Sequence, residues 1–374
     1  MKLVAVVGTR PEAIKMAPVI LEARKRGCEV CVVATGQHRA MLDQVHDVFG
    51  ISPERDLDLM RPDQELADLT ARALVAVDEV LGVEAPDWVL VQGDTTTAMA
   101  SALSAFYRRI RLGHVEAGLR TNDLERPFPE ELNRIVADRV GRAHFAPTAG
   151  ARQNLLREGL GEETIHLTGN TVVDALHAIL ESSAGSAEVP GLPTLAPGER
   201  LVLVTAHRRE SFGDGMICIA RAVARLAEAH PEVRIGFPVH PNPNVRRVMH
   251  DLLGNTPRVH LVEPLGYPTF VKLMARASLV LTDSGGVQEE APALGVPALV
   301  LRETTERPEA VAAGAVALVG LGEDDIFAAA DEILRSDEAH ARMARAVNPY
   351  GDGHAAARIV SILLGEPWAP FRTE

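Results

Sequence analysis

The stretch ASLVLTDSGGVQEEAPALGVP, residues 277–297, is the most informative guide to how this chain folds. An apolar run at 279–282, typical of a buried β-strand, breaks at Asp283–Gly286, and a helical pattern follows. Glycines let backbone N–H groups approach an anion closely, and the first turn of a helix offers unpaired N–H groups beside its positive dipole end. Glu290 would lie about one turn into that helix, where a carboxylate can accept bonds from a ribose. A nucleotide diphosphate is therefore the first ligand to consider, although a plain strand-to-helix turn would use the same residues.

Length and composition indicate a globular protein with more than one domain. A chain of 374 residues exceeds what one core usually supports, and 47% apolar with 24% charged residues is ordinary for a globular protein. No uncharged apolar run approaches the roughly 18 residues of a membrane span. The first residues, MKLVAVVGTRPEA, read as a strand and a turn, so no signal peptide is expected either. The net charge of −13 argues against nucleic acid or an anionic membrane as partner.

The cysteines indicate a reducing, cytoplasmic environment. Cys28, Cys31 and Cys218 are too few for a disulfide framework. Cys28 and Cys31 form a CxxC, but redox pairs of this kind use a helix N-terminus to activate a thiol, whereas this pair opens the β-type run CEVCVVAT. We expect both to pack in the core.

Apolar runs alternate with amphipathic stretches along the chain. In the first half the expected strands are Leu3–Val7, Val30–Ala34, Trp88–Gln92, Arg111–Val115 and Ala143–Ala146. In the second half they are Leu201–Thr205, Arg234–Pro238, Val259–Val262, Leu279–Thr282, Ala298–Leu301 and Ala315–Val319. This βαβ rhythm predicts parallel, doubly wound sheets with helices on both faces.

One stretch interrupts this rhythm. Residues 181–200, ESSAGSAEVPGLPTLAPGER, are rich in Gly, Ser and Pro and are interpreted as an interdomain linker. The predicted architecture is α/β, with Rossmann-like domains over residues 1–180 and 201–350 and a C-terminal helix within 351–374 that packs back on the first domain. The two doubly wound domains are expected to face each other across a cleft.

Polar groups follow the expected strands. Ligands of doubly wound sheets bind beyond the carboxyl ends of the strands, so these positions are candidates for a site. They are Gly8–Glu12, Gly93–Thr97, Glu116–Arg120, His207–Glu210 and Asp283–Gly286. Another candidate is Glu130 in RPFPEELNR. These residues also have structural alternatives: Asp94 can be a helix N-cap, Glu130 can be a first-turn acid, and His207 can be a packed histidine. Their shared position at strand ends favours one catalytic cleft.

Several motifs of other enzyme classes are missing. His114 and Glu116 form an HxE, which in zinc deaminases supplies a metal ligand and an acid/base, but no PCxxC follows. HExxH and GxSxG are absent, and GTRPEA stands where a GxGxxG dinucleotide fingerprint would follow the first strand. We therefore expect neither a metal nor a nicotinamide or flavin cofactor.

Longer motifs carry a family resemblance. They are GTRPEAIKMAP, QHR, QGDTTT, GHVEAGLRT, PFPEELNR, TGNTVVDAL, AHRRESFG, PVHPNPNVR, LTDSGGVQEEAP, TTERPEA and NPYGDG, spread from Met1 to about Leu364. The chain resembles the non-hydrolysing UDP-N-acetylglucosamine 2-epimerases. The resemblance implies a glycosyltransferase-B-type fold and interconversion of UDP-N-acetylglucosamine and UDP-N-acetylmannosamine without cofactor or metal. It also implies UDP as a partner and a role in supplying cell-surface polysaccharide synthesis.

The resemblance further implies a route and site residues. UDP leaves C1, the C2 proton is removed to give 2-acetamidoglucal, and UDP re-adds after protonation from the opposite face. Carboxyl groups whose pKa values differ can supply both acid and base. Positions matching the family's catalytic residues are Asp94, Glu116, Glu130 and His207. Positions matching its UDP-sugar ligands are Arg10, Lys15, Phe270, Ser284, Gly285, Gly286, Glu290 and Arg307.

Bacterial members of this family are also homodimers activated by their own substrate at a second site. Polar positions of that site are matched by Gln37, Gln64, Arg208 and His240. Ala40 and Asp63 replace the Gln and Arg that related sequences often carry there. Leu265 replaces a Gln that some relatives place near the uracil.

Three alternatives stay open. A glycosyltransferase would use the same fold and nucleotide cradle but needs an acceptor groove, and Asp94, Glu116 and Glu130 argue against it. A hydrolysing epimerase would start from the same residues and release UDP with free N-acetylmannosamine, so product analysis separates the two. A UDP-sugar-binding regulator without turnover conflicts with the intact acid and base positions.

Overall fold

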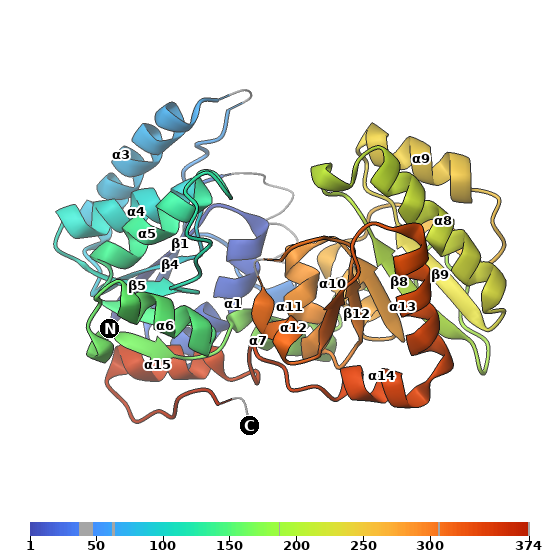
Figure 1. The fold of residues 1–374 in the computed structure, drawn as a ribbon. Coiled ribbons are helices and arrows are strands. Elements are labelled where there is room, and N and C mark those ends of the chain that lie inside the picture. Colours follow the sequence, from blue (N-terminus) through green and yellow to red (C-terminus); the bar gives the residue numbers. More distant parts are fainter. Residues whose placement is uncertain (37–47, 62–63, 187, 306, 373–374) are drawn as a thin grey trace. The chain divides into compact units, whose positions relative to one another are not determined.

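The computed structural model describes residues 1–36, 48–61, 64–186, 188–305 and 307–372. The chain divides into two compact units, Met1–Ala178 with Tyr350–Arg372, called unit 1, and Ile179–Pro349, called unit 2. Each is an α/β unit in which strands alternate with helices, as predicted (Figure 1). Within the described residues, none of the helices combines the length and the apolar character needed to cross a lipid bilayer.

Unit 1 is built on a seven-stranded parallel sheet with the order β3-β2-β1-β4-β5-β6-β7. Its strands are β1 Lys2–Val7, β2 Glu29–Ala34, β3 Arg55–Asp56, β4 Trp88–Gln92, β5 Arg111–Val115, β6 Ala143–Ala146 and β7 Ile165–Leu167. The strands predicted for this half are confirmed, and β3 and β7 extend the sheet at its edges. Sequence analysis missed them because β3 is two charged, exposed residues and β7 only three residues. The order reverses between β1 and β4, which is where such sheets bind ligands.

Helices cover both faces of this sheet (Figure 1). They are α1 Arg10–Lys25, α3 Leu66–Glu84, α4 Thr96–Tyr107, α5 Glu130–Val140, α6 Ala149–Arg157, the 3-10 turn η1 Glu162–Thr164, α7 Thr171–Glu181 and α15 Ala355–Leu364. On one face α4 packs against α3 and α5, and on the other α1 packs against α15. Cys28 and Cys31 are buried, as their place in a β-type run predicts.

The last segment of the chain, from Tyr350 onward, belongs to unit 1. Arg26, just after α1, donates to Ser361 Oγ at 2.7 Å and to Glu366 Oε2 at 2.9 Å. Asp174 on α7 accepts from the backbone N–H groups of Ala355 at 3.2 Å and Ala356 at 2.9 Å, and so caps the N-terminus of α15. These contacts fix α15 to the first sheet's helices.

Unit 2 contains a six-stranded parallel sheet with the order β10-β9-β8-β11-β12-β13. Its strands are β8 Arg200–Thr205, β9 Val233–Pro238, β10 Val259–Val262, β11 Leu279–Thr282, β12 Ala298–Val300 and β13 Val316–Leu318. Its helices are η2 Arg209–Ser211, α8 Asp214–Ala229, α9 Pro243–Leu253, α10 Tyr267–Met274, α11 Gly285–Ala293, α12 Pro308–Ala312, α13 Glu323–Arg335 and α14 Asp337–Ala344. The predicted strands are again confirmed, and this sheet reverses between β8 and β11.

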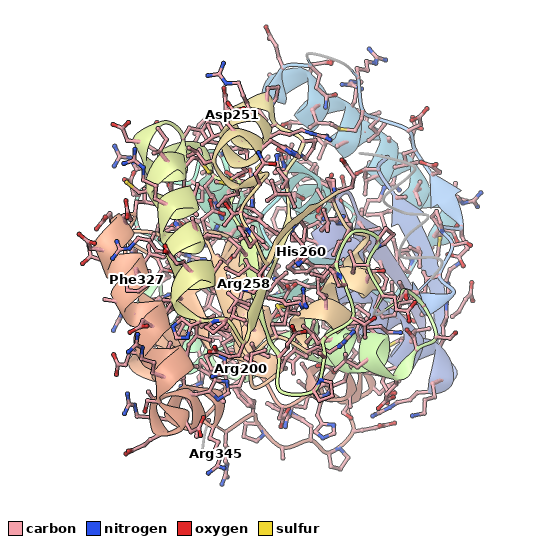
Figure 2. All side chains as sticks on the ribbon, turned by 90° about the vertical axis from the view of Figure 1, so that its right-hand side faces the viewer. Arg200, Asp251, Arg258, His260, Phe327 and Arg345 are labelled. Atoms are coloured by element: carbon pink, nitrogen blue, oxygen red, sulfur yellow. The ribbon has the colours of Figure 1, made fainter. Side chains whose placement is uncertain are left out.

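Arginine side chains hold the outer helix α13 in place. Arg200, at the start of β8, donates from Nη1 to the carbonyl of Leu334 at 2.7 Å, in the last turn of α13. A guanidinium there satisfies a carbonyl that lacks a partner within the helix. On the same helix the ring of Phe327 lies 4.3 Å from the guanidinium of Arg225. Figure 2 labels Arg200, on β8, and Phe327, on α13.

The Gly/Pro-rich stretch between α7 and β8 packs on unit 2. Lys272 on α10 donates to the carbonyl of Ser182 at 2.9 Å, and Arg234 on β9 donates to Glu199 at 2.7 Å. Val189 in the middle of the stretch is buried. The described part of the stretch interpreted from sequence as a linker therefore contacts α10 near its start and β9 near its end.

Candidate active site

Glu116 lies at the carboxyl end of β5 with its side chain held by three donors. Gln92 Nε2 donates to Oε1 at 3.0 Å, Asn170 Nδ2 donates to Oε2 at 2.8 Å, and the Lys15 ammonium contacts Oε2 directly. The backbone of Glu116 is left-handed, with φ of 65°, so the extended conformation of β5 ends at the preceding residue, Val115. Such an arrangement orients a carboxylate rather than leaving it to rotate in solvent.

Asp94 follows β4, the neighbouring strand. Its carboxylate forms an ion pair with Arg134 on α5, and its backbone carbonyl accepts from Asn133 Nδ2 at 2.9 Å. The N-cap of α4 is Thr95, whose hydroxyl accepts from Ala98 N at 3.0 Å. The N-cap alternative for Asp94 is therefore wrong by one residue, and its carboxylate, with 31% of the side chain exposed, remains accessible.

Glu130 is the first residue of α5, as the first-turn interpretation predicts. Its Oε2 is buried and has no hydrogen-bond partner among the described residues. The adjacent Glu131 is different, because it accepts from the backbone N–H groups of Thr121 at 3.0 Å and Asn122 at 2.8 Å. A buried carboxylate oxygen without a donor is costly, which makes Glu130 a candidate for contact with a bound ligand.

Glu12 is a buried acid in this region that sequence reasoning did not single out. Its Oε2 accepts from Gly8 N at 3.0 Å and Thr9 N at 2.5 Å, and its Oε1 accepts from the Thr95 hydroxyl at 2.6 Å. Burial raises the pKa of Glu12 from 4.5 to about 7, although these hydrogen bonds act in the opposite direction. The Thr-x-x-Glu capping box at Thr9–Glu12 is the sequence signal that could have found it. Glu12 thus ties the end of β1 to the turn that carries Asp94.

His114 supports the same turn from inside the sheet. Nδ1 lies 2.6 Å from Asp138 Oδ1, and Nε2 lies 2.7 Å from the carbonyl oxygen of Gly93. Because both ring nitrogens face acceptors, both carry a proton. Burial lowers the pKa of His114, but Asp138 and the Gly93 carbonyl raise it by more, so it is raised overall. Arg120 donates to the other oxygen of Asp138 at 2.7 Å and completes a buried ionic network.

The two residues of the HxE pair, His114 and Glu116, therefore lie in different surroundings. His114 is in the interior and Glu116 is at the site, so the two do not share a ligand. Among the described residues, no group of three His, Cys, Asp or Glu side chains is placed to hold a metal ion.

In unit 2 the predicted cradle forms at the end of β11. Ser284 is the N-cap residue of α11, and its hydroxyl makes no capping hydrogen bond, so the N–H groups at Gly285 and Gly286 begin the helix without a side-chain cap. Asp283 is fully buried and accepts from the backbone N–H groups of His207 at 2.9 Å and Arg208 at 2.8 Å. Asp283 therefore joins the loop after β8 to the cradle, while Ser284 to Gly286 are placed to meet an anion.

The His207 ring stacks on the His240 ring, with centroids 5.5 Å apart and an interplanar angle of 20°. Its Nδ1 lies 3.3 Å from Asp283 Oδ1. Burial lowers the pKa of His207, Asp283 partly offsets this, and His240 and Arg208 lower it again. A neutral imidazole held at this position can donate one hydrogen bond and accept another.

Two further predicted nucleotide ligands, Glu290 and Arg307, have hydrogen-bond partners within unit 2. Glu290 on α11 accepts from the Tyr267 hydroxyl at 2.8 Å, and Tyr267 was not predicted. Arg307 donates to Glu289 at 2.7 Å. Phe270 lies on α10 and is half-buried. These contacts order the side chains around the cradle.

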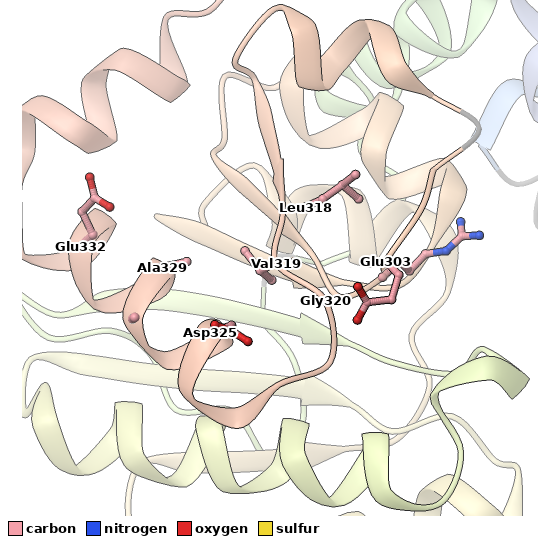
Figure 3. Close-up of a pocket in the computed structure, with 9 residues that line it drawn as sticks. Glu303, Leu318, Val319, Gly320, Asp325, Ala329 and Glu332 are labelled. Carbon is pink, nitrogen blue, oxygen red and sulfur yellow. The ribbon is translucent and has the colours of Figure 1, made fainter.

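A separate cavity of about 520 Å³ opens beside the edge strand β13 (Figure 3). Carboxylates and small apolar groups line it, among them Glu303, Asp325, Glu332, Leu318 and Ala329. None of the predicted site residues contributes to it.

Comparison with known proteins places the chain in a family. The family model described as UDP-N-acetylglucosamine 2-epimerase matches residues 21–364. The chain belongs to the UDP-N-acetylglucosamine 2-epimerase family. The curated epimerase of Salmonella typhimurium is 50% identical over 371 residues, covering 97% of this chain and 98% of the relative.

Solved structures agree with this family and with the fold. The Neisseria meningitidis UDP-GlcNAc 2-epimerase, crystallised bound to UDP-GlcNAc, is 46% identical, has a TM-score of 0.89 and covers 98% of this chain and all of its own. A glycosyltransferase of kitacinnamycin, only 13% identical, matches with a TM-score of 0.67 over 97% of this chain and 98% of its own, which indicates a shared fold. The predicted two-sheet α/β architecture is therefore confirmed.

The epimerase-family positions fall into three groups. In unit 1, Lys15 and Glu116 are in direct contact, and Asp94 and Glu130 lie at the adjoining ends of β4 and α5, with Arg10 at the start of α1. In unit 2, His207, Ser284 and Glu290 lie at or beside the cradle. Of the predicted activating positions, Gln64 accepts from Arg72 at 2.7 Å, His240 stacks on His207, and the backbone of Arg208 donates to Asp283. Gln37 lies outside the described residues, as do Ala40 and Asp63, which replace residues often found in relatives.

Proposed function

We propose that this chain catalyses reversible epimerisation at C2 of UDP-N-acetylglucosamine to UDP-N-acetylmannosamine without net hydrolysis. The observation that carries the proposal is the set of three carboxylates at adjoining elements of unit 1, one of which has a buried oxygen without a donor among the described residues. The relative crystallised with UDP-GlcNAc supports the substrate class.

The chemistry follows from the bond changes. The C1–O bond breaks with its electron pair leaving on the diphosphate of UDP, a carboxylate takes the C2 proton, and the C1–C2 double bond of 2-acetamidoglucal forms. A proton then returns to C2 from the opposite face, and a diphosphate oxygen bonds to C1. The proton leaves from one face of the sugar ring and returns to the other, which requires more than one acid/base group. Asp94, Glu116 and Glu130 are proposed as that set, with Lys15 as a neighbouring cation.

Departure of UDP places negative charge on the diphosphate, so donors arranged beforehand lower the barrier. The proposal assigns this role to Arg10, His207 and the helix start at Ser284 to Gly286. Glu290, oriented by Tyr267, is assigned to the ribose, and Phe270 and Arg307 to the rest of the nucleotide.

Further parts of the proposal concern assembly and control. The protein is proposed to act in the cytoplasm as a homodimer whose two units are separate domains, supplying polysaccharide synthesis. It is also proposed to be activated by its substrate through Gln64, Arg208 and His240. Equilibrium sedimentation and a sigmoidal dependence of rate on substrate concentration test these two statements.

The main test is proton NMR of UDP-N-acetylglucosamine incubated with the enzyme in D2O containing EDTA. Growth of UDP-N-acetylmannosamine signals with deuterium at C2 is the expected outcome. Glu130→Gln should abolish that growth, whereas Glu125→Gln, an exposed acid in the preceding loop, should not. An unchanged substrate spectrum with the native enzyme would contradict the proposal.

The hydrolysing reaction is the second candidate, because the same carboxylates can start it. Its products are UDP and free N-acetylmannosamine, and both have resolved signals in the same spectrum. Accumulation of free sugar in step with substrate loss would select that candidate.

A further inference from the structure

Two buried amide side chains donate hydrogen bonds to the carboxylate of Glu116, one to each oxygen. Gln92 at the end of β4 and Asn170 before α7 are each only 3% exposed. Gln92 Nε2 lies 3.0 Å from Oε1 and Asn170 Nδ2 lies 2.8 Å from Oε2. An ionised carboxylate only accepts hydrogen bonds, so both amides must turn their NH2 groups toward it.

The Asn170 amide has no freedom to turn round. Its Oδ1 accepts from Val172 N at 3.0 Å, so Nδ2 is the only group it can present to Glu116. Its backbone N–H donates to the carbonyl of Tyr350 at 2.6 Å. Tyr350 is the residue at which the chain re-enters unit 1. Asn170 is thus held at three points, one of them on the returning chain.

The returning chain fits closely against this residue. A Cβ atom added at Gly351 would come within 3.1 Å of Val173 Cγ2 and 3.3 Å of the Asn170 carbonyl oxygen. A side chain larger than glycine would therefore crowd Val173 and Asn170 at this point. The returning chain thus packs closely against the residue that carries the Asn170 amide.

We propose that Asn170 and Gln92 are positioning residues that fix the Glu116 carboxylate for C2 chemistry. This inference rests on the proposed epimerase function. A carboxylate has about four acceptor positions, and among the described residues Gln92, Asn170 and Lys15 occupy three, which leaves one on Oε1 for the C2 chemistry. The amides are uncharged, so they set direction while Lys15 supplies the compensating charge. Neither amide needs to touch the substrate.

The test compares Asn170→Ala and Gln92→Met with Thr171→Val. Thr171 is the next residue, and its buried hydroxyl has no hydrogen-bond partner in the described part of the chain, so its removal controls for a change at the start of α7. Loss of a hydrogen bond to a charged group predicts a fall in kcat of about 10- to 100-fold in each amide variant, with KM changed far less. Thermal unfolding with and without UDP shows whether each variant is folded and binds nucleotide. If Asn170→Ala does not fold, Gln92→Met decides the test.

Asn170→Asp adds a readout that a purely structural role would not change. Below the upper pKa of the new carboxyl pair, the introduced group carries a proton and can donate to Glu116 as the amide does. Above it, two carboxylates oppose each other, with Lys15 the charged group facing both, and Glu116 loses its orientation. Activity of this variant should therefore decline as pH rises over a range where the native enzyme and Asn170→Ala do not decline.

The outcomes separate the two proposals. A selective fall in kcat in the amide variants, with the pH signature of Asn170→Asp, supports the positioning role. If native enzyme turns over UDP-N-acetylglucosamine while all amide variants match Thr171→Val, the positioning role is wrong and the epimerase function stands. If native enzyme and Thr171→Val both fail to epimerise, the proposed function is wrong and the positioning role falls with it.

Discussion

Replacing Glu12 with glutamine should make the protein more stable at alkaline pH. The native carboxyl is buried beneath the β1 and β4 ends, where its oxygens accept from Gly8 N, Thr9 N and the Thr95 hydroxyl. A glutamine can keep the two backbone contacts through its carbonyl oxygen and donate its NH2 to the Thr95 oxygen. It thereby imitates the protonated acid without ever becoming charged.

The size of the effect follows from the pKa of Glu12, which burial raises from 4.5 to about 7. The unfolded chain releases this proton at lower pH than the folded chain, so the free energy of unfolding decreases as pH rises from 4.5 to about 7 and is level above that. At about 1.4 kcal/mol for each pH unit, the loss amounts to about 3 kcal/mol. Glu12→Gln should remove this dependence and gain up to about 3 kcal/mol over the native protein near pH 8.

Guanidinium unfolding between about pH 5 and about pH 8 measures the effect. Thr95→Val serves as the control, because it removes the α4 cap and one donor to Glu12 but keeps the carboxyl. It should be less stable by about 1 kcal/mol at acidic pH. Because the Thr95 hydrogen bond lowers the pKa of Glu12, its loss should leave a pH dependence at least as steep as that of the native protein, in contrast to Glu12→Gln. A Glu12→Gln protein whose stability declines with pH in parallel with the native protein would show that Glu12 is not the group responsible for the decline.

Three further predictions concern neighbouring acids and their partners. Glu130→Gln should lower kcat by at least about 100-fold without lowering the melting temperature, since an uncharged amide is easier to bury than a carboxylate; a fall in melting temperature with kcat retained would contradict this. Arg134→Met should remove the cation beside Asp94 and lower kcat by about tenfold. Arg139→Met, further along α5, is the control and should leave kcat unchanged. Equal kcat values in the two variants would show that the ion pair does not affect turnover. Burial raises the pKa of Asp174 from 3.8 to about 6, so the native protein loses stability as pH rises across that range. Asp174→Asn has one acceptor oxygen where the carboxylate uses two, so it keeps one of the two cap contacts to α15, and its stability relative to the native protein should rise across the same pH range in thermal unfolding. Asp174→Ala, which loses the cap, should be less stable at acidic pH, and identical behaviour of the two variants would argue against the assignment.

The strands could be predicted because their signal is local. Trp88–Gln92 is buried along its whole length, and a strand covered on both faces of a parallel sheet reads as a continuous apolar run. Arg55–Asp56 has no such run, because it is an exposed edge pair that forms only against β2. Asp94 and Glu116 could be proposed for the site for a related reason: they directly follow strands whose ends meet at one edge of the sheet.

The surroundings of those carboxylates could not be predicted in the same way. Lys15 is 101 residues from Glu116 and Asn170 is 54 residues from it, so no local pattern connects them. The sequence allows Asp94 as the N-cap of α4, and only the observed hydrogen bonds assign that role to Thr95. The capping box at Thr9–Glu12 is visible in sequence, but the burial that raises the pKa of Glu12 depends on packing against the turn after β4.

The order of strands and helices, and the acids that follow the strands, can be read from the residues in order, because apolar periodicity and turn residues act over a few neighbouring positions. The partners of each acid come from the packing of distant segments. This packing paired Asp94 with Arg134, surrounded Glu116 with Lys15 and two amides, and left a buried oxygen of Glu130 without a partner among the described residues. The reason is that burial and charge depend on groups distant in the chain, and these two quantities set the protonation and direction of a carboxyl group.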